Sequence, residues 1–431
     1  MEISVLVLIF SFVILLAMNV PIAFSIGIAT ILTMLFTIAP MPAVTTVAQR
    51  MATGINSFAL LAIPFFILSG QLMGKGGIAR RLIDFAKVIV GMLPGGLAYV
   101  NVMACMFFGA ISGSAVAATS AIGGFMIPTM NKEGYDKNFN TAITVTGSTT
   151  GLLIPPSNVL IVYSLASGGV SIAALFIAGY LPGILLGLGL IGVAAIIAVM
   201  KKYPVGERVS AWEGIKKLLD AIPSLLLVVI VIGGIIAGYF TATEASAVAV
   251  LYSLLLSVVI YREVKIKELP QILLKTVETT AIVMLLIGTS SGMSWILSYE
   301  NIPQNISATL IALTNSKIVI LLIINIILLI VGTFMDMTPA VLIFTPIFLP
   351  VVIQLGVTPL HFGIMLVLNL CIGLCTPPVG SVLFVGCGIG NTNIASMSRA
   401  LIPFYIIMIL VLMLVTYIPW ISLVLPKVFG Y

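Results

Sequence analysis

Two motifs rich in glycine and proline are the part of this sequence best suited to binding an ion. Gly151-Leu-Leu-Ile-Pro-Pro-Ser157 recurs as Gly373-Leu-Cys-Thr-Pro-Pro-Val379, each time within a long apolar stretch. Because proline lacks an N–H, each Pro-Pro pair removes the helical donors to two carbonyls four residues earlier. Carbonyl oxygens freed in this way are ligands for small hard cations. The motifs therefore predict two interrupted helices and two cation sites.

Segments with small and hydroxyl-bearing residues precede each motif and complete the predicted cation sites. Ser112-Gly-Ser114 precedes the first motif, and Gly332-Thr333 precedes the second. The predicted cation ligands are Ser112, Ser114, Gly151 and Leu152 in the first site, and Gly332, Thr333, Gly373, Leu374 and Thr376 in the second. The alternative interpretation is a pair of proline kinks that only adjust helix packing.

Asp336 is the single residue most indicative of function. A charge near the centre of a membrane segment costs about 2.5 to 3.5 kcal/mol and normally serves function. Its carboxylate could bind a substrate hydroxyl or amine, a cation or a proton, or it could pair with a structural partner. Ser157 and Asn158 precede a predicted half-helix whose positive N-terminal end would favour a carboxylate. The predicted substrate-binding residues are Ser112, Ser157, Asn158, Asp336 and Thr338.

The composition requires a membrane around these residues. Of 431 residues, 61% are hydrophobic and 7% are charged, which leaves too little polar surface for a soluble globule. Apolar stretches that approach or exceed the length of a bilayer crossing predict about ten or eleven crossings in a single polytopic unit, residues 1–431. The formal net charge of +6 does not indicate nucleic-acid binding, because the basic residues cluster in short connections.

Four basic connections predict the orientation of the chain. The positive-inside rule places them in the cytoplasm. Their basic residues are Lys75, Arg80, Arg81 and Lys87 in the first, Lys132 and Lys137 in the second, Lys201, Lys202, Arg208, Lys216 and Lys217 in the third, and Arg262, Lys265, Lys267 and Lys275 in the fourth. The connections at 164–171, 299–316 and 354–361 have only Lys317 at an edge and are predicted to lie outside.

The two motifs belong to a longer internal repeat with a constant offset of 222 residues. The matched pairs are Pro128 and Pro350, Gly134 and Gly356, Gly151 and Gly373, Pro155 and Pro377, Ile172 and Ile394, and Ser114 with Asp336. Repeated segments interrupted by Gly and Pro indicate the binding site of a secondary transporter. Basic connections flank residues 93–130 but are almost missing around 318–353, so we expect the copies to be inverted across the membrane.

A segment that begins and ends on the same side of the membrane must turn back within it. We therefore expect residues 93–130 to form a re-entrant helical hairpin that turns at Ser112-Gly-Ser114. Its mate would enter from outside and turn within residues 332–339. Close helix packing through Gly109 and Gly113 is the alternative for the first tip. The predicted organisation is a first transport repeat at 93–172, mainly scaffold helices at 173–300, a second repeat at 315–395 and a terminal helix at 396–431.

Signals for enzymes and bound cofactors are missing from the sequence. There is no HExxH motif and no Ser/His/Asp set, and Gly70-Gln-Leu-Met-Gly-Lys-Gly76 lacks the spacing and the Ser/Thr of a phosphate-binding loop. The four cysteines lie in apolar segments, where cysteine packs as a small hydrophobic residue. We expect no enzymatic activity and no cofactor.

The chain resembles a known family, the large membrane subunit (called M or DctM-like) of tripartite ATP-independent periplasmic (TRAP) transporters. The resemblance covers essentially the whole chain. It rests on Asn56-Ser-Phe-Ala-Leu-Leu-Ala-Ile-Pro-Phe-Phe66, Gly109-Ala-Ile-Ser-Gly-Ser114, Thr241-Ala-Thr-Glu-Ala245 and the two Gly/Pro motifs. Thr241-Ala-Thr-Glu departs from the family's Thr-Pro-Thr-Glu, with a small expected effect on the start of that helix, which Glu244 is predicted to cap.

The resemblance implies a sodium-driven importer of organic anions with an elevator-type fold, similar to the ion transporter superfamily. Sodium would be the coupling ion at both cation sites. The expected partners are a small membrane subunit (Q), an extracytoplasmic substrate-binding protein (P) and the lipid bilayer of the bacterial inner membrane. C4-dicarboxylates, sialic acid and related sugar or keto acids all remain open as substrates. A stand-alone sodium/anion symporter and a channel or scaffold subunit are the alternatives.

Overall fold

The computed structural model describes residues 3–206, 210–314, 316–377 and 379–431, and these residues are almost entirely helical. The first repeat contains α6 (Gly96–Ser112), α7 (Ala115–Lys132), α8 (Lys137–Thr150), α9 (Asn158–Ala166) and α10 (Ile172–Met200). The second contains α15 (Lys317–Phe334), α16 (Met337–Gln354), α17 (Pro359–Gly373), α18 (Ser381–Gly390) and α19 (Ile394–Tyr417).

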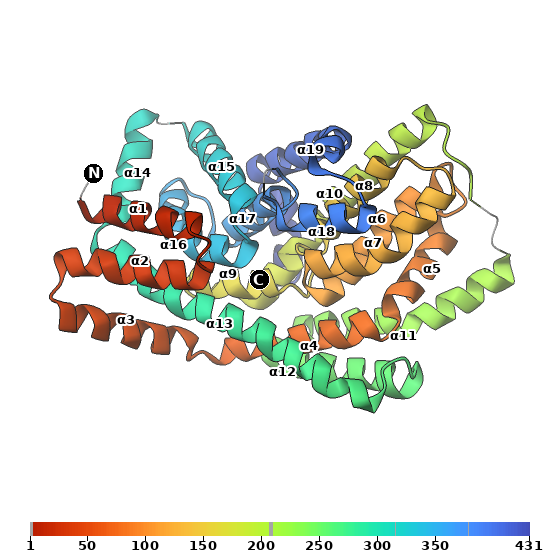
Figure 1. Cartoon of the computed structure of the whole chain (residues 1–431), viewed down its shortest axis with the longest axis horizontal. Helices are drawn as coiled ribbons and strands as arrows, with labels where there is room; N and C mark the ends of the chain where they lie inside the picture. Colours follow the sequence, from red (N-terminus) through yellow and green to blue (C-terminus); the bar gives the residue numbers. More distant parts are fainter. Residues whose placement is uncertain (1–2, 207–209, 315, 378) are drawn as a thin grey trace.

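The remaining helices flank these two sets (Figure 1). They are α1 (Ile3–Ala17), α2 (Ile22–Thr37), α3 (Pro40–Ile55), α4 (Ala62–Lys75), α5 (Ile78–Val90), α11 (Ala211–Ile236), α12 (Ala242–Leu254), α13 (Leu269–Tyr299), α14 (Ile302–Leu313) and α20 (Trp420–Val428). Short segments are the 3-10 turns Phe58–Leu61 and Ile266–Glu268, and a π-helical extension of α12 at Leu255–Ile260. Thr241 and Glu244 form the predicted capping box at the start of α12.

The helix boundaries confirm the internal repeat. The starts of α7 and α16 are 222 residues apart, as are those of α8 and α17 and those of α10 and α19. Each repeat therefore contains a helical hairpin, a helix interrupted at the Gly/Pro motif, and a long closing helix. Pro378, which belongs to the second motif, lies outside the described residues.

Contacts at the helix ends show that the two repeats are inverted. The Tyr163 hydroxyl, near the end of α9, donates to the Pro359 carbonyl at the start of α17. The Thr392 hydroxyl, just after α18, donates to the Asn138 side chain at the start of α8. The interrupted helix α8–α9 therefore ends where α17–α18 begins, and the reverse also holds. The two interrupted helices run antiparallel, as the charge pattern predicted.

The basic connections gather on one side of the molecule. Arg81, from the first connection, pairs with Asp220 at 3.3 Å and with Glu263 at 3.0 Å, which lie next to the third and fourth connections. Lys201 lies 3.8 Å from Asp136 and so joins the second connection to the third. By the positive-inside rule, this side is cytoplasmic.

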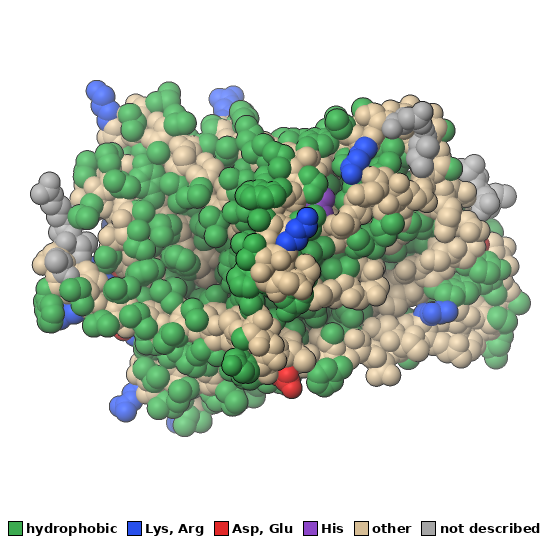
Figure 2. All heavy atoms as spheres, turned by 180° about the vertical axis from the view of Figure 1, so that it is seen from behind, with side chains coloured by type: hydrophobic (Ala, Val, Ile, Leu, Met, Phe, Trp, Pro, Cys, Tyr) green, Lys and Arg blue, Asp and Glu red, His purple; other side chains and the backbone are tan. Residues whose placement is uncertain are grey.

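The connections predicted to lie outside also meet one another. The Ser307 hydroxyl donates to the Gln354 side chain at 2.7 Å, and the Tyr163–Pro359 hydrogen bond joins the end of α9 to the start of α17. Eight helices within the described residues are long and apolar enough to cross a bilayer, and five shorter helices are also apolar. Figure 2 shows apolar side chains over most of one face, with few charged ones. These features identify an integral membrane protein.

Both hairpins turn where small or polar residues were expected to stop a helix. Gly113, between α6 and α7, has a φ of 61°, a left-handed conformation that favours glycine. Ser114 then caps α7 by accepting a hydrogen bond from the Ala117 amide at 3.2 Å. In the second hairpin, Met335 and Asp336 are extended, and Asp336 occupies the N-cap position of α16. Its carboxylate makes no capping bond within the described residues.

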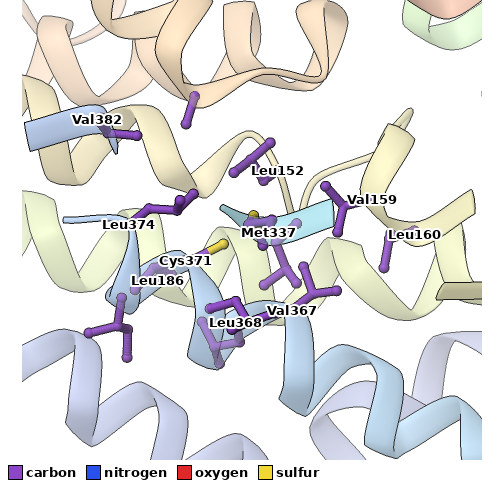
Figure 3. Packing of buried hydrophobic residues seen from close by; sticks show 14 of the residues in the cluster. Leu152, Val159, Leu160, Leu186, Met337, Val367, Leu368, Cys371, Leu374 and Val382 are labelled. Carbon is purple, nitrogen blue, oxygen red and sulfur yellow. The ribbon is translucent and has the colours of Figure 1, made fainter. Parts of the chain in front are cut away.

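Each interrupted helix presses its glycine against a glycine of the hairpin in the same repeat. A Cβ atom on Gly151 would lie 2.3 Å from the Cα of Gly109, and one on Gly373 would lie 2.5 Å from the Cα of Gly332. Backbones can approach this closely only where both residues lack a side chain. Apolar side chains around the two interruptions fill the surrounding core, including Leu152, Leu374 and Met337 (Figure 3).

Candidate substrate and ion site

The two hairpin tips and the two helix interruptions meet in one cavity of about 590 Å³, which we call the central cavity. Its polar lining residues are Gln71, Ser112, Ser114, Ser120, Asn158, Thr279, Asp336, Thr338 and Ser381. The tips contribute from α6–α7 and α15–α16, and the interruptions from the starts of α9 and α18. The helices α4 and α13 form the opposite wall. Residues distant in sequence thus converge on a site of a size typical of small-molecule pockets.

The electrostatics of the central cavity are mixed. Asp336 is the only charged residue among its described lining. The helices α9 and α18 begin at the cavity with Asn158 and Ser381, so two positive helix ends face it. The Asn158 side-chain oxygen is buried and lacks a hydrogen-bond partner within the described residues, and the buried Ser381 hydroxyl has the Asp336 carboxyl as its neighbour across the cavity lining. Buried polar groups without partners require an explanation, and a ligand in the cavity would supply one.

Most of the predicted substrate-binding residues come together. Ser112, Asn158, Asp336 and Thr338 all line the central cavity. Ser157 does not line it. Its side chain is fully buried, and its hydroxyl donates to the Leu152 carbonyl within the interruption. The hydroxyl of Ser157 therefore closes the first helix interruption and is held away from the cavity.

The residues predicted for the first cation site lie around the first hairpin tip. Ser112, Ser114 and Leu152 line the cavity, and Gly151 packs behind them against Gly109. The Ser112 hydroxyl donates to the Ser114 carbonyl at 3.4 Å. The Leu152 carbonyl already accepts the Ser157 hydrogen bond, so only its second lone pair is left for an ion.

In the second predicted cation site, carbonyls of the second tip and of the second interruption lie close to Gly380. The Thr333 carbonyl accepts from the Gly380 amide at 3.1 Å, which ties the second tip to the second interruption. A Cβ atom on Gly380 would lie 2.7 Å from the Leu374 carbonyl oxygen and 3.0 Å from that of Thr376. Two carbonyls thus face the same glycine.

The remaining predicted ligands of this second site make local hydrogen bonds. The Gly373 carbonyl accepts from the Thr376 amide at 2.9 Å. The Thr333 hydroxyl donates to the Ile330 carbonyl of its own helix, and the Thr376 hydroxyl donates to the Ile372 carbonyl near the end of α17, both at 2.7 Å. Gly332 provides the close contact with Gly373.

The donors available for a cation are hydroxyls and carbonyls. No group of three or more His, Cys, Asp or Glu residues that could hold a metal ion occurs in the part of the chain that the structure describes. Transition-metal centres use imidazole, thiolate and carboxylate ligands, whereas the predicted cation sites present hydroxyls and carbonyls. Oxygen donors without a carboxylate cluster suit a monovalent hard cation.

The structure adds residues that sequence reasoning missed. Gln71 and Thr279 belong to the wall formed by α4 and α13, Ser120 to α7, and Ser381 to the first turn of α18. Ser381 stands two residues after the second Gly/Pro motif, so its position could have indicated its place in the cavity. The segment 70–76, which lacks the pattern of a phosphate-binding loop, instead contributes Gly70, Gln71 and Gly74 to this wall.

Close helix packing through Gly109 and Gly113 was the alternative to a re-entrant first tip, and the structure contains elements of both. Gly109 packs against Gly151, as the interpretation through close helix packing required, whereas Gly113 makes the turn of the hairpin. A Cβ atom on Gly113 would lie 2.9 Å from the Asn158 side-chain nitrogen. Close packing and a re-entrant tip therefore coexist, because the contact of Gly109 with Gly151 positions the hairpin tip at Gly113.

A cavity with convergent polar groups, placed in a membrane protein between two inverted hairpins and two interrupted helices, defines the class of secondary transporters. The chain belongs to the family of the DctM component of tripartite ATP-independent periplasmic transporters, whose model matches residues 9–421. Its members are permease subunits of transporters of bacterial inner membranes, not enzymes.

Three relatives show how far the family likeness extends. The chain is 53% identical to the uncharacterized protein YgiK of Salmonella typhimurium over 99% of this chain and 98% of that one. It is 44% identical to the C4-dicarboxylate TRAP transporter large permease protein DctM of Pseudomonas aeruginosa, covering 86% and 87% of the chains. It is 39% identical to the sialic acid TRAP transporter large permease protein SiaM of Vibrio cholerae, covering 89% and 90%.

A solved structure shares the fold. The YdaH transporter of Alcanivorax borkumensis aligns with a TM-score of 0.63 over 90% of each chain, at 14% sequence identity. At this identity the likeness concerns the fold alone.

Proposed function

We propose that this protein is the large permease subunit that imports an organic anion with sodium across the bacterial inner membrane. A periplasmic binding protein delivers the anion, and a small membrane subunit completes the complex. The observation that carries this proposal is the central cavity, where both hairpin tips and both helix interruptions meet around unpartnered polar groups. Family membership supports the partners.

The anion binds through neutral donors and helix ends in this proposal. The amide of Asn158 and the hydroxyl of Ser381 stand at the starts of α9 and α18, where the helix dipoles favour a carboxylate. Ser112 and Thr338 add hydroxyl donors from the two tips. Asp336 cannot attract a carboxylate, so it binds a hydroxyl or amine of the substrate, a cation or a proton.

Sodium binding is coupled to anion binding through the shape of the tips. Cations at the two predicted sites would bring the hydroxyl of Ser112 and the carbonyls of Leu374 and Thr376 into fixed positions, and would offset the charge of the anion. An anion would then bind well only when sodium is present. The hydrogen bond from Gly380 to Thr333 supports this coupling, because it joins the second tip directly to the second cation site.

An elevator movement accounts for transport across the membrane. In this proposal the two hairpins and the two interrupted helices move as one body against a wall formed by α3, α4 and α13. The wall touches the moving part closely at Gly70, where a Cβ atom would lie 2.9 Å from the Ser112 carbonyl oxygen. The central cavity lies along this boundary, so the substrate would travel with the tips.

The substrate class is a small carboxylic acid of the C4-dicarboxylate or sialic acid type. The names of the Pseudomonas and Vibrio relatives supply these two candidates. A volume of about 590 Å³ holds either of them and excludes neither. The binding protein provides much of the substrate specificity, so the permease needs only to recognise the carboxylate of the substrate.

Uptake into proteoliposomes tests the proposal. The vesicles contain this chain and its small subunit, and purified binding protein is loaded with radiolabelled succinate or sialic acid. We expect uptake that requires both the binding protein and an inward sodium gradient. Sodium-driven uptake without the binding protein would instead indicate a stand-alone symporter, and sodium-independent flux would contradict the two cation sites.

A further inference from the structure

A second cavity lies along the same boundary, nearer the outside, and we call it the outer cavity. Its volume is about 310 Å³. It is lined by Arg50, Thr53 and Gly54 of α3, by Ile287, Ser290, Ser291 and Ser294 of α13, and by Leu165, Ala166, Leu342 and Pro346 of α9 and α16. The outer cavity therefore lies between the wall of α3, α4 and α13 and the second hairpin, and the central cavity lies between the same parts nearer the cytoplasm.

The position of the outer cavity follows from the course of α13. This helix starts within the fourth basic connection, on the cytoplasmic side, and ends at Tyr299, where the outer connection 299–316 begins. Thr279 faces the central cavity and Ser290 faces the outer one. Eleven residues of helix separate them, a rise of about 16 Å. The outer cavity thus occupies the outward half of the boundary.

Arg50 gives the outer cavity a positive charge that no described residue neutralises. It is the only charged residue in the described lining, and it makes no ion pair among the described residues. Its guanidinium carbon lies 5.8 Å from the ring centre of Trp295, which stacks on Tyr299. An aromatic face holds a guanidinium in place without cancelling its charge.

Ser290 provides an independent sign of a ligand. Its residue is 3% exposed, its side chain lines the outer cavity, and its hydroxyl has no hydrogen-bond partner within the described residues. Gly54 brings α3 close to this part of α13, because a Cβ atom there would lie only 2.1 Å from the Ser291 hydroxyl. A planar cation and a free buried hydroxyl therefore face one small space.

We infer that the outer cavity binds a carboxylate group on its way from outside to the central cavity. The guanidinium would hold the two carboxylate oxygens through paired N–H donors, and the Ser290 hydroxyl would donate to one of them. A volume of about 310 Å³ fits one small acid or one end of a larger one. The direction of travel rests on the proposed function, whereas binding itself does not.

Trp295 allows binding to be measured directly. The chain has three tryptophans, so a variant with Trp212→Phe and Trp420→Phe leaves Trp295, beside Arg50, as its only one. Any tryptophan of the small subunit is likewise replaced by Phe, so that the emission comes from Trp295 alone. The purified complex with its small subunit is titrated with succinate, and with sodium chloride at equal ionic strength. We expect a saturable change of Trp295 emission with succinate and none with chloride. Equal responses to both salts, or none to succinate, would overturn the inference.

Variants in the single-tryptophan background identify the groups responsible. Arg50→Gln should raise the apparent Kd for succinate about ten-fold or more, because a charged hydrogen-bonding pair is lost. Arg50→Lys should recover part of the loss. Ser290→Ala should weaken binding by a smaller factor, and Thr45→Ala, an exposed position of α3 whose hydroxyl bonds only its own helix, should leave it unchanged. An unchanged Kd in Arg50→Gln would also overturn the inference.

Asp336→Asn separates failure of this inference from failure of the proposed function. It should retain the Trp295 response, since Asp336 lines the central cavity and not the outer one, while it loses uptake. In the uptake assay, Arg50→Gln should raise KM and change the maximal rate less. Loss of the Trp295 response in Asp336→Asn would show that the signal arises in the central cavity and would contradict a separate outer site.

Discussion

At the scale of single residues, the site depends on which side chains remain free and which are used for structure. Asp336 and Ser114 occupy equivalent N-cap positions, yet only Ser114 caps its helix. Ser157, a predicted substrate ligand, instead uses its hydroxyl within the fold, where it donates to the Leu152 carbonyl. The two repeats therefore differ. The second repeat has a carboxylate at its hairpin tip, and in the first repeat the helix interruption is closed by a hydrogen bond from its own serine.

Asp336→Asn should abolish uptake, or reduce it at least ten-fold, because the carboxylate faces the central cavity without a capping bond. The variant keeps the shape of the side chain and removes its charge. Uptake by proteoliposomes measures the effect, and size-exclusion chromatography with the small subunit shows whether the complex still assembles. Thr129→Ala, an exposed hydroxyl on α7, is the control. Uptake equal to that of the unmodified protein would refute a role for the charge.

Ser157→Ala should lower stability more than it changes substrate affinity. It leaves the buried Leu152 carbonyl without its donor, which costs about 1 to 3 kcal/mol. Thermal unfolding in detergent measures the loss, and Ser298→Ala, an exposed serine bonded to its own helix, should show almost none. A large rise in the KM of uptake with unchanged stability would instead restore Ser157 as a substrate ligand.

At the scale of helices, two pairs of glycines set the distance between hairpin and interrupted helix. Gly109 meets Gly151 in the first repeat, and Gly332 meets Gly373 in the second. These contacts press each tip against its interruption, so that hydroxyls and carbonyls of different helices reach the same cavity. The Gly/Pro motif thus does two things: proline interrupts the helix, and glycine allows another helix to touch it.

Gly151→Ala should impair both folding and uptake, because its methyl group would lie 2.3 Å from the backbone of Gly109 and the hairpin must shift. Gly124→Ala on α7, where nothing lies within 4 Å, is the matched control and should behave like the unmodified protein. Thermal stability and sodium-dependent uptake are measured for both. A harmless Gly151→Ala would show that the hairpin and the interrupted helix are not held together by this contact.

At the scale of the whole molecule, both cavities lie between the wall of α3, α4 and α13 and the two repeats. The central cavity faces α4 and the first half of α13, and the outer cavity faces α3 and the second half. The wall thus presents polar groups at two depths of the membrane. This arrangement suits a transport domain, formed by the two repeats, that moves between these two depths. The movement proposed above therefore predicts that fixing the repeats to the wall stops transport.

Cross-linking across the outer cavity tests this movement. Ser294→Cys on α13 and Leu342→Cys on α16 line the same cavity, and the four native cysteines are buried. A bifunctional thiol reagent should reduce uptake by at least ten-fold in the double variant, and not in either single one. Persistent uptake in a fully cross-linked protein would contradict a rigid-body displacement of the second hairpin along α13.

The sequence by itself determined the class of the protein, the repeat and the elements of the site. Apolar composition required a membrane, and basic connections indicated the orientation. A constant offset between Gly and Pro positions predicted interrupted helices at both motifs. Such features are local or periodic, and the chain shows them without any knowledge of its contacts. The hairpin tips at Ser112-Gly-Ser114 and within residues 332–339 were predicted from the flanking charges, because a segment that begins and ends on one side of the membrane must turn back, and from the small and polar residues at its centre.

Only the tertiary structure decided which polar groups share a cavity and which are used within the fold. Gln71 and Thr279 reach the central cavity from α4 and α13, and no local pattern marks either one. The sequence placed Ser157 beside the substrate, but its hydroxyl satisfies a carbonyl exposed by the prolines, because buried backbone must find a partner. Arg50 and Ser290 acquire their meaning from the packing of α3 against α13. Long-range contacts of this kind depend on how faces pack, which residue order alone does not specify.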